Sequence, residues 1–216
     1  MADRQDIADL VARARTALTN AKSDPDLAAA LLPFGYDGKK LDEATALVDA
    51  LAAAEARQDA EYGEQYEATE DADKAFEGAK AVYMRHVAIS RIAFEGDTSL
   101  IGALALRGDR EDDRPGLMAQ ARTFYTNALA SAEAMEDLGA LNVDKVSLEA
   151  GEAALNAAAL AIAVQTEETG EAQEATVVRD AAARVLAAWL ARFFKVAKVA
   201  CDGQPQLRER LGLLER

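Results

Sequence analysis

Apolar residues recur at intervals of three and four along two very long stretches of the chain, which predicts two amphipathic helices. The stretches cover residues 39–94 and 146–201, and neither contains proline. At ~1.5 Å per residue, each helix would extend roughly 80 Å. No segment alternates apolar and polar residues as a strand does, so the sequence predicts an all-α protein.

Shorter helical patterns precede and follow each long helix. The short helices expected before the long ones cover residues 3–21, 25–32, 115–129 and 132–140. Asp37 and Asp144 stand directly before the long helices, where a carboxylate accepts hydrogen bonds from the first free N–H groups. Gly96 and Gly203 follow the long helices as C-terminal stop signals, and short leucine-bearing helices come after them.

The two halves of the sequence resemble each other. The alignment that pairs Leu10 with Leu117 continues without a gap to Asp109 and Arg216, and 32 of the 100 paired positions are identical. We call this alignment the repeat register. Matches other than alanine include Arg15, Thr16, Thr19 and Asn20, which recur as Arg122, Thr123, Thr126 and Asn127. We therefore interpret the chain as a tandem duplication of a helical unit, with repeat units at 1–109 and 110–216.

The apolar seam of each long helix is interrupted near its middle. The first seam runs from Leu41 to Tyr83 and the second from Leu148 to Leu190, and both pass through a central run of polar positions. Because a polar helix surface does not form core, we expect hydrophobic packing at the two ends of each helix and none in the middle.

Antiparallel pairing of the long helices would bury the apolar ends of both seams. The first half of each helix then lies beside the second half of the other, and the short helices pack at both ends as small bundles. The predicted shape is a dumbbell with a pseudo-twofold axis, in which the two repeat units intertwine around a two-helix waist, a coiled-coil arrangement. The alternative is an open form, in which the long helices pair with a second chain.

The repeat is strongest in the predicted waist, where eight of sixteen positions match between residues 58–73 and 165–180. One glycine is retained in each copy, although glycine inside a helix costs about 1 kcal/mol relative to alanine. Small residues let two backbones approach closely. We therefore predict a close helix crossing, at Gly63, Ala68, Gly170 and Ala175.

The waist also repeats its acids. Glu64 and Glu67 lie three residues apart and can share one helix face, as can Glu171 and Glu174. Four converging carboxylates would suit a calcium, magnesium or manganese ion. The competing interpretations are acids that are simply solvated and a partner-docking surface on the waist.

Composition narrows the class of function. A net charge of −14 argues against nucleic-acid binding, because nothing offsets repulsion from the phosphates. No apolar run approaches the ~20 residues of a membrane span, and no signal peptide is recognisable, so we expect a soluble cytoplasmic protein. The single histidine, His86, aligns with Phe193, which favours a packing role, and the single cysteine, Cys201, fits a buried structural thiol.

No pattern typical of hydrolases, phosphate-binding loops or dinucleotide-binding folds is present. The sequence therefore favours a non-enzymatic structural or protein-interaction helical protein, with a protein partner or self-association and no nucleic acid or membrane. The alternative is a helical bundle that binds a small ligand or a divalent cation through the waist carboxylates.

Overall fold

A computed structural model describes residues 4–213, whose regular elements are all helices. They are α1 (Arg4–Ser23), α2 (Pro25–Leu31), the 3-10 turn η1 (Leu32–Phe34), α3 (Gly38–Ala93), α4 (Thr98–Ala103), α5 (Arg114–Ala130), α6 (Ala132–Ala140), α7 (Lys145–Ala200) and α8 (Pro205–Arg210). The all-α prediction is confirmed for the described part of the chain. The helices α3 and α7 contain 56 residues each, and both their first and their last residues are paired in the repeat register.

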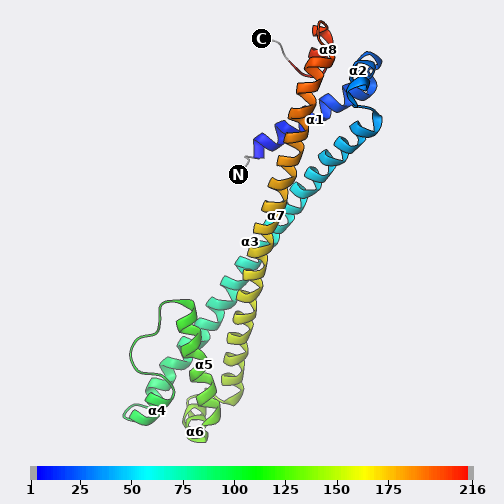
Figure 1. Cartoon of the computed structure of the whole chain (residues 1–216). Coiled ribbons are helices and arrows are strands. Elements are labelled where there is room, and N and C mark those ends of the chain that lie inside the picture. The colour runs from blue at the N-terminus through cyan, green and yellow to red at the C-terminus, as the bar shows by residue number, and fades with distance from the viewer. Residues whose placement is uncertain (1–3, 214–216) are drawn as a thin grey trace. The chain divides into compact units, whose positions relative to one another are not determined.

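The described residues form two compact units. Unit 1 contains the chain up to Gly63 and again from Gly170 onward, and unit 2 contains Glu64–Thr169. Figure 1 labels α1, α2 and α8 of unit 1, and α4, α5 and α6 of unit 2. Each unit includes half of α3 and half of α7, so the spatial division does not follow the sequence boundary after Asp109.

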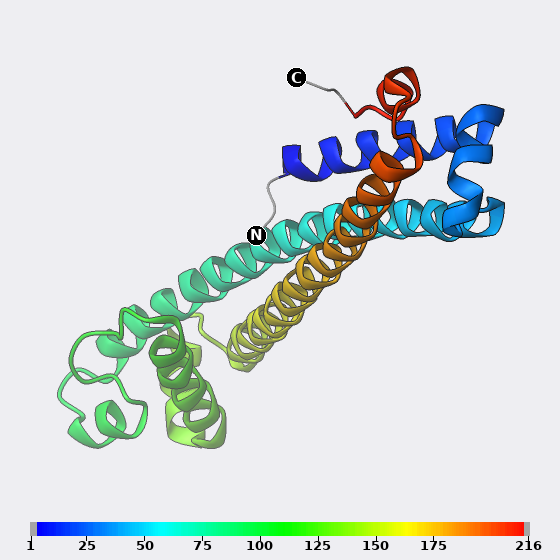
Figure 2. The ribbon, with the colours of Figure 1, turned by 45° about the horizontal axis from the view of Figure 1, so that its top comes forward.

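In unit 1 the first half of α3 lies antiparallel to the second half of α7. Gln58 Nε2 donates a hydrogen bond to Thr176 Oγ1 at 3.0 Å. Tyr36, just before α3, packs edge-on against Phe193, near the end of α7, with ring centroids 5.2 Å apart. The two contacts show that α3 and α7 run in opposite directions along this unit. Figure 2 shows this part of the chain from a second direction, with α1 beside the two long helices.

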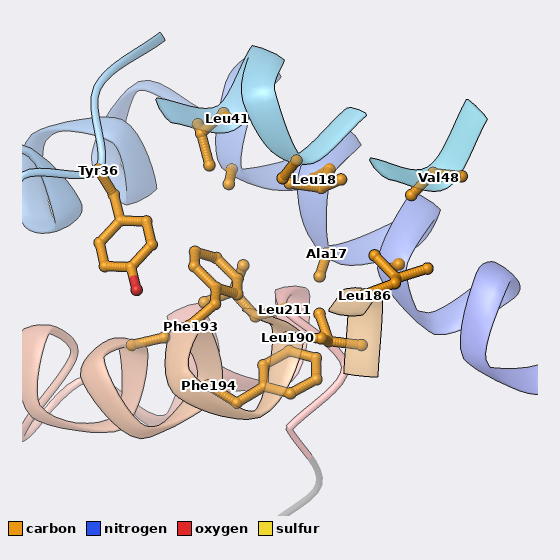
Figure 3. Close-up of a cluster of buried hydrophobic side chains, with 14 of the residues drawn as sticks. Ala17, Leu18, Tyr36, Leu41, Val48, Leu186, Leu190, Phe193, Phe194 and Leu211 are labelled. Atoms are coloured by element: carbon orange, nitrogen blue, oxygen red, sulfur yellow. The ribbon is translucent and has the colours of Figure 1, made fainter. Parts of the chain in front are cut away.

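The core of unit 1 joins α1, α2, α3, α7 and the α8 segment. Its buried side chains include Ala17, Leu18, Leu27, Leu41, Val48, Leu51, Leu186, Leu190, Phe193, Ala197, Cys201 and Leu211. Figure 3 shows Phe193 between Tyr36 and the leucines that α1 and α7 contribute. The apolar ends of the predicted seams are thus core positions.

Unit 2 repeats this order with the other halves of the long helices. Gln165 Nε2 donates to Thr69 Oγ1 at 3.3 Å, and His86 Nε2 lies 3.1 Å from Ser147 Oγ. The two contacts again place a later α3 residue opposite an earlier α7 residue. The buried core includes Tyr83, Phe94, Leu104, Leu117, Phe124, Tyr125, Leu138, Leu148 and Leu155. Pairing of the long helices within the chain is therefore confirmed in each unit.

The long helices begin and end as their sequence predicts. Asp37 Oδ1 accepts a hydrogen bond from the Lys40 amide at 2.8 Å, and Asp144 Oδ1 accepts from the Ser147 amide at the same distance. After each helix, Gly96 and Gly203 adopt φ angles of 92° and 72°. That left-handed conformation is one that residues with a Cβ rarely adopt, so glycine ends the helix there.

Two polar side chains from the middle of the seams are buried, where the sequence predicted no hydrophobic packing. Gln58 is 7% exposed and Arg179 is 8% exposed. Arg179 Nη1 donates to Gln58 Oε1 at 2.7 Å, and its Nη2 donates to Asp180 Oδ1 at 2.6 Å. A polar side chain can be buried when its groups are paired, and these two side chains pair with each other.

Candidate functional site

The four glutamates of the predicted cation site are all exposed. Glu64 and Glu67 lie on α3 in unit 2, whereas Glu171 and Glu174 lie on α7 in unit 1. A four-carboxylate site for calcium, magnesium or manganese stays a prediction.

In unit 1 an arginine lies among these acids. Arg57 Nε donates to Glu61 Oε1 at 3.1 Å. The hydrogen bond to Glu61 and that residue's charge raise the pKa of the Arg57 guanidinium, and the charges of Glu174 and Glu171 raise it further. The fixed positive charge of Arg57 therefore offsets part of the acidic charge that a bound cation would otherwise neutralise.

The two glycines of the predicted helix crossing are exposed. A Cβ built on Gly63 or on Gly170 meets no other atom within 4 Å among the described residues. Ala68 is half-buried, and Ala175 is buried on α7. The described structure therefore gives neither glycine a steric reason to lack a side chain.

We expect Gly63→Ala and Gly170→Ala each to raise the free energy of unfolding by about 0.5–1 kcal/mol. Alanine loses less backbone entropy than glycine when a helix forms, and both positions have room for a methyl group. Urea denaturation of the two single variants and the double variant measures the change. A loss of stability in either variant would show that the glycine is needed for a close contact.

Repeated polar residues of the predicted waist form hydrogen bonds between α3 and α7. The bond from Gln58 to Thr176 in unit 1 corresponds, in the repeat register, to the bond from Gln165 to Thr69 in unit 2. Each threonine also donates to a backbone carbonyl four residues earlier in its own helix. Helix pairing in both units thus gives the matching glutamine and threonine positions the same structural role.

A second repeated residue, asparagine, also has a structural role. Asn20 Nδ2 donates to the backbone carbonyl of Arg210 in unit 1. Asn127 Nδ2 donates to the backbone carbonyl of Ala103 in unit 2 at 2.6 Å. Ala103 and Arg210 are themselves paired in the repeat register, so the same bond holds the short helix that follows each long helix. The matched positions were visible in the sequence, but their hydrogen-bond partners were not.

Removing the amide of Gln58 is expected to cost about 1–3 kcal/mol of folding free energy. Gln58→Ala takes away the acceptor of the buried Arg179 guanidinium and the donor to Thr176. The matched control is Gln165→Ala, because the unit 2 position that corresponds to Arg179 is Ala72. Thermal and urea denaturation should show the larger loss for Gln58→Ala, and equal losses would contradict a special role for the arginine.

His86 is buried in unit 2 and uses both ring nitrogens. Its Nδ1 lies 3.2 Å from Tyr125 Oη, and its Nε2 lies 3.1 Å from Ser147 Oγ. Burial lowers the pKa of His86, and the charge of the neighbouring Arg85 lowers it further. Burial also raises the pKa of the Tyr125 hydroxyl. The network links α3, α5 and α7, which supports the packing role inferred from the sequence.

The lowered pKa of His86 predicts that acid destabilises unit 2. Above about pH 6.5 the imidazole is neutral in both folded and unfolded chains. Below that pH the unfolded chain takes up a proton first, so stability falls by at most about 1.4 kcal/mol per pH unit until the folded-state pKa is passed. Urea denaturation between pH 7.5 and 5 should therefore show a steeper decline for the natural chain than for His86→Gln, which keeps hydrogen-bonding groups but does not titrate. Parallel curves would contradict this origin.

Cys201 is buried in the core of unit 1, as the sequence suggested. Burial raises the pKa of its thiol above the ordinary value, with a smaller opposing effect from Arg208. Because the thiolate is the reactive form, this environment keeps the sulfur unreactive near neutral pH.

An open groove of about 670 Å³ lies between α1 and α7 in unit 1. Ile7, Leu10 and Ala183 form its apolar part, and Asp9 and Arg184 are among its charged residues. Since acidic and basic side chains both line the groove, its charge does not select one class of ligand.

Comparison with known protein families, with curated proteins and with solved structures finds no match.

Proposed function

We propose that the protein is a non-enzymatic structural or protein-interaction protein, in which two small helical bundles are joined by shared long helices. One observation carries the proposal. The helices α3 and α7 each continue for 56 residues through both compact units. A helix of that length extends about 84 Å, far more than one small core can cover. Such helices suit a spacer between binding surfaces.

The proposal includes an origin by tandem duplication. The equal length of α3 and α7, and the corresponding glutamine–threonine and asparagine–carbonyl bonds, support it. A duplicated unit whose halves exchange partners gives two bundles that share part of their contacts. That arrangement suits a protein that presents similar surfaces at two places.

The environments of two residues support a non-enzymatic role. His86 is surrounded by the unit 2 core, and both its ring nitrogens contact side chains of packed helices. Cys201 is enclosed in the unit 1 core, where burial disfavours its thiolate. The residue types most often used as general base and as sulfur nucleophile are therefore both committed to packing.

Small-angle scattering, extrapolated to zero protein concentration, tests the spacer proposal. A compact globule of this length has a radius of gyration of about 17 Å. An extended two-lobed chain should give about 25 Å or more, because each long helix alone spans about 84 Å. A value near that of the compact globule would refute the proposal.

A further inference from the structure

One face of α7 in unit 2 is left uncovered by the described residues. Leu148 and Leu155 point into the core, but apolar residues on the opposite side of the helix are exposed. Val146 is 70% exposed, Leu160 is 68% exposed and Val164 is 41% exposed. The exposed apolar row, here called the α7 stripe, consists of Val146, Ala150, Ala153, Ala157, Leu160 and Val164.

The α7 stripe has the spacing of a coiled-coil seam. Its members follow one another at alternating intervals of four and three residues, the spacing of the a and d positions of a heptad, which keeps a row facing a partner helix. Between Val146 and Val164 the only charged residues are Glu149 and Glu152, and neither belongs to the stripe. A surface without charge is unusual in a chain whose residues are 29% charged.

The corresponding face of α3 differs in its charge. The six α3 positions that pair with the α7 stripe in the repeat register are Lys39, Glu43, Ala46, Ala50, Ala53 and Arg57. Three of these six side chains carry a charge, whereas none of the six in the α7 stripe does. The apolar row is therefore specific to α7 and does not follow from the helical repeat alone.

We propose that the α7 stripe is the surface through which two copies of this chain associate, with the two α7 helices antiparallel. The inference rests on the proposed interaction function and names the partner. A twofold axis beside Leu155 would place Val146 opposite Val164 of the second copy. The same axis sets Ala150 opposite Leu160 and Ala153 opposite Ala157. In heptad terms, Ala150, Ala157 and Val164 are a positions, and Val146, Ala153 and Leu160 are d positions. Each a position then faces a d position of the second copy, and the large Leu160 packs against the small Ala150, as close packing requires.

Charge also fits this pairing. The same axis sets Glu149 beside Ala163 of the other copy, and it brings Lys145 near Glu167, which carries the opposite charge. Asn156 lies beside its own counterpart, so two amides can exchange hydrogen bonds. No acid faces an acid along the stripe, which matters in a chain with a net charge of −14 because self-association elsewhere is repulsive.

A lipid bilayer is the other apolar environment to consider, because α7 is long and apolar enough to cross a membrane by length and composition. A spanning helix needs apolar surface all around it. On α7 only one side is free, since Leu148 and Leu155 belong to the unit 2 core. A one-sided row at the spacing of a coiled-coil seam fits a partner helix better than lipid.

Sedimentation equilibrium of the full chain over a wide range of protein concentration tests the proposal. The natural chain should show a reversible monomer–dimer equilibrium. Leu160→Glu should weaken association at least tenfold, because it places an unpaired charge in the apolar contact. Ala53→Glu adds the same charge at the corresponding exposed position of α3, and it should leave the equilibrium unchanged.

A charge exchange tests the antiparallel register. Ala150→Lys and Leu160→Glu should each associate weakly alone, whereas a mixture of the two variants should form a heterodimer through one lysine–glutamate pair and one natural leucine–alanine contact. Parallel pairing would place position 150 opposite position 150, so the mixture would gain nothing. Failure of the mixture to associate would therefore overturn the register.

Other outcomes also overturn the inference. They are a natural chain that stays monomeric at every concentration, a dimer that Leu160→Glu leaves intact, and a monomer that co-sediments with phosphatidylcholine vesicles. Small-angle scattering of the Leu160→Glu variant separates this inference from the proposed function. An extended monomer keeps the spacer proposal even if no dimer forms, and a compact one refutes it whether or not the dimer exists.

Discussion

Phe193→Ala is expected to lower the free energy of unfolding by about 3–5 kcal/mol, the largest loss that we predict for a single substitution. Phe193 is fully buried in unit 1. Its ring lies 5.2 Å from the Tyr36 ring and stacks on Trp189, also at 5.2 Å between centroids. Alanine would leave a cavity lined by rigid aromatic rings, which cannot collapse to fill it.

The control for this substitution is Phe34→Ala, which removes the same atoms from an exposed position. Its expected effect is within about 0.5 kcal/mol, as for most surface substitutions. Urea denaturation followed by circular dichroism gives both values. A loss below about 1 kcal/mol for Phe193→Ala would mean that the ring is not part of a tightly packed core.

Gly151→Ala is expected to destabilise the protein by about 1–3 kcal/mol, although alanine favours helices. A Cβ built at Gly151 would overlap Tyr125 Oη and would lie 2.5 Å from Tyr125 Cζ. The tyrosine ring cannot easily move away, since it is buried against Phe124 and its hydroxyl contacts His86. Gly63→Ala makes the same change inside a helix at a position with open space, and we expect it to stabilise the protein. Comparison of the two variants therefore separates the steric clash at Gly151 from the effect of helix propensity.

The corresponding residues of unit 1 suggest a compensating change. Residues Leu18 and Ala44 of unit 1 correspond to Tyr125 and Gly151, and both are buried. The double variant Gly151→Ala/Tyr125→Leu should therefore be more stable than the sum of the two single effects predicts, by about 0.5–3 kcal/mol. Simple additivity in this double-mutant cycle would contradict a clash between the two side chains.

Much of the helical architecture could be predicted from the sequence. The long helices were expected at 39–94 and 146–201, and they are observed one residue earlier at both ends. The prediction succeeded because a helical apolar pattern, an aspartate before each helix and a glycine after it all indicate the same bounds. These are local properties, which a single sequence contains in full.

The buried pair of Gln58 and Arg179 could not be predicted from local sequence patterns. Gln58 and Arg179 are 121 residues apart, and each can be buried only because the other accepts or donates. The residue type and local pattern of each one alone predict an exposed side chain. Whether a polar side chain is buried depends on a partner that the local pattern does not identify.

The important glycine was also missed, for a related reason. The matching positions of Gly63 and Gly170 predicted a close contact there, but both glycines have open space around them. Gly151 aligns with an alanine, so the repeat indicated no close contact at that position. Glycine is required there because Tyr125 in unit 2 occupies space that Leu18, at the corresponding position of unit 1, leaves free.

The division of the chain between the two units has a consequence for synthesis on the ribosome. Unit 2 is one continuous segment, so all its residues are available once Thr169 has been made. The part of unit 1 that precedes Glu64 packs against residues from Gly170 onward. Its apolar side chains therefore stay without these packing partners during most of translation. The last part of α7 and the α8 segment therefore complete unit 1, and a chain truncated before Phe193 would expose that incomplete core to chaperones and proteases.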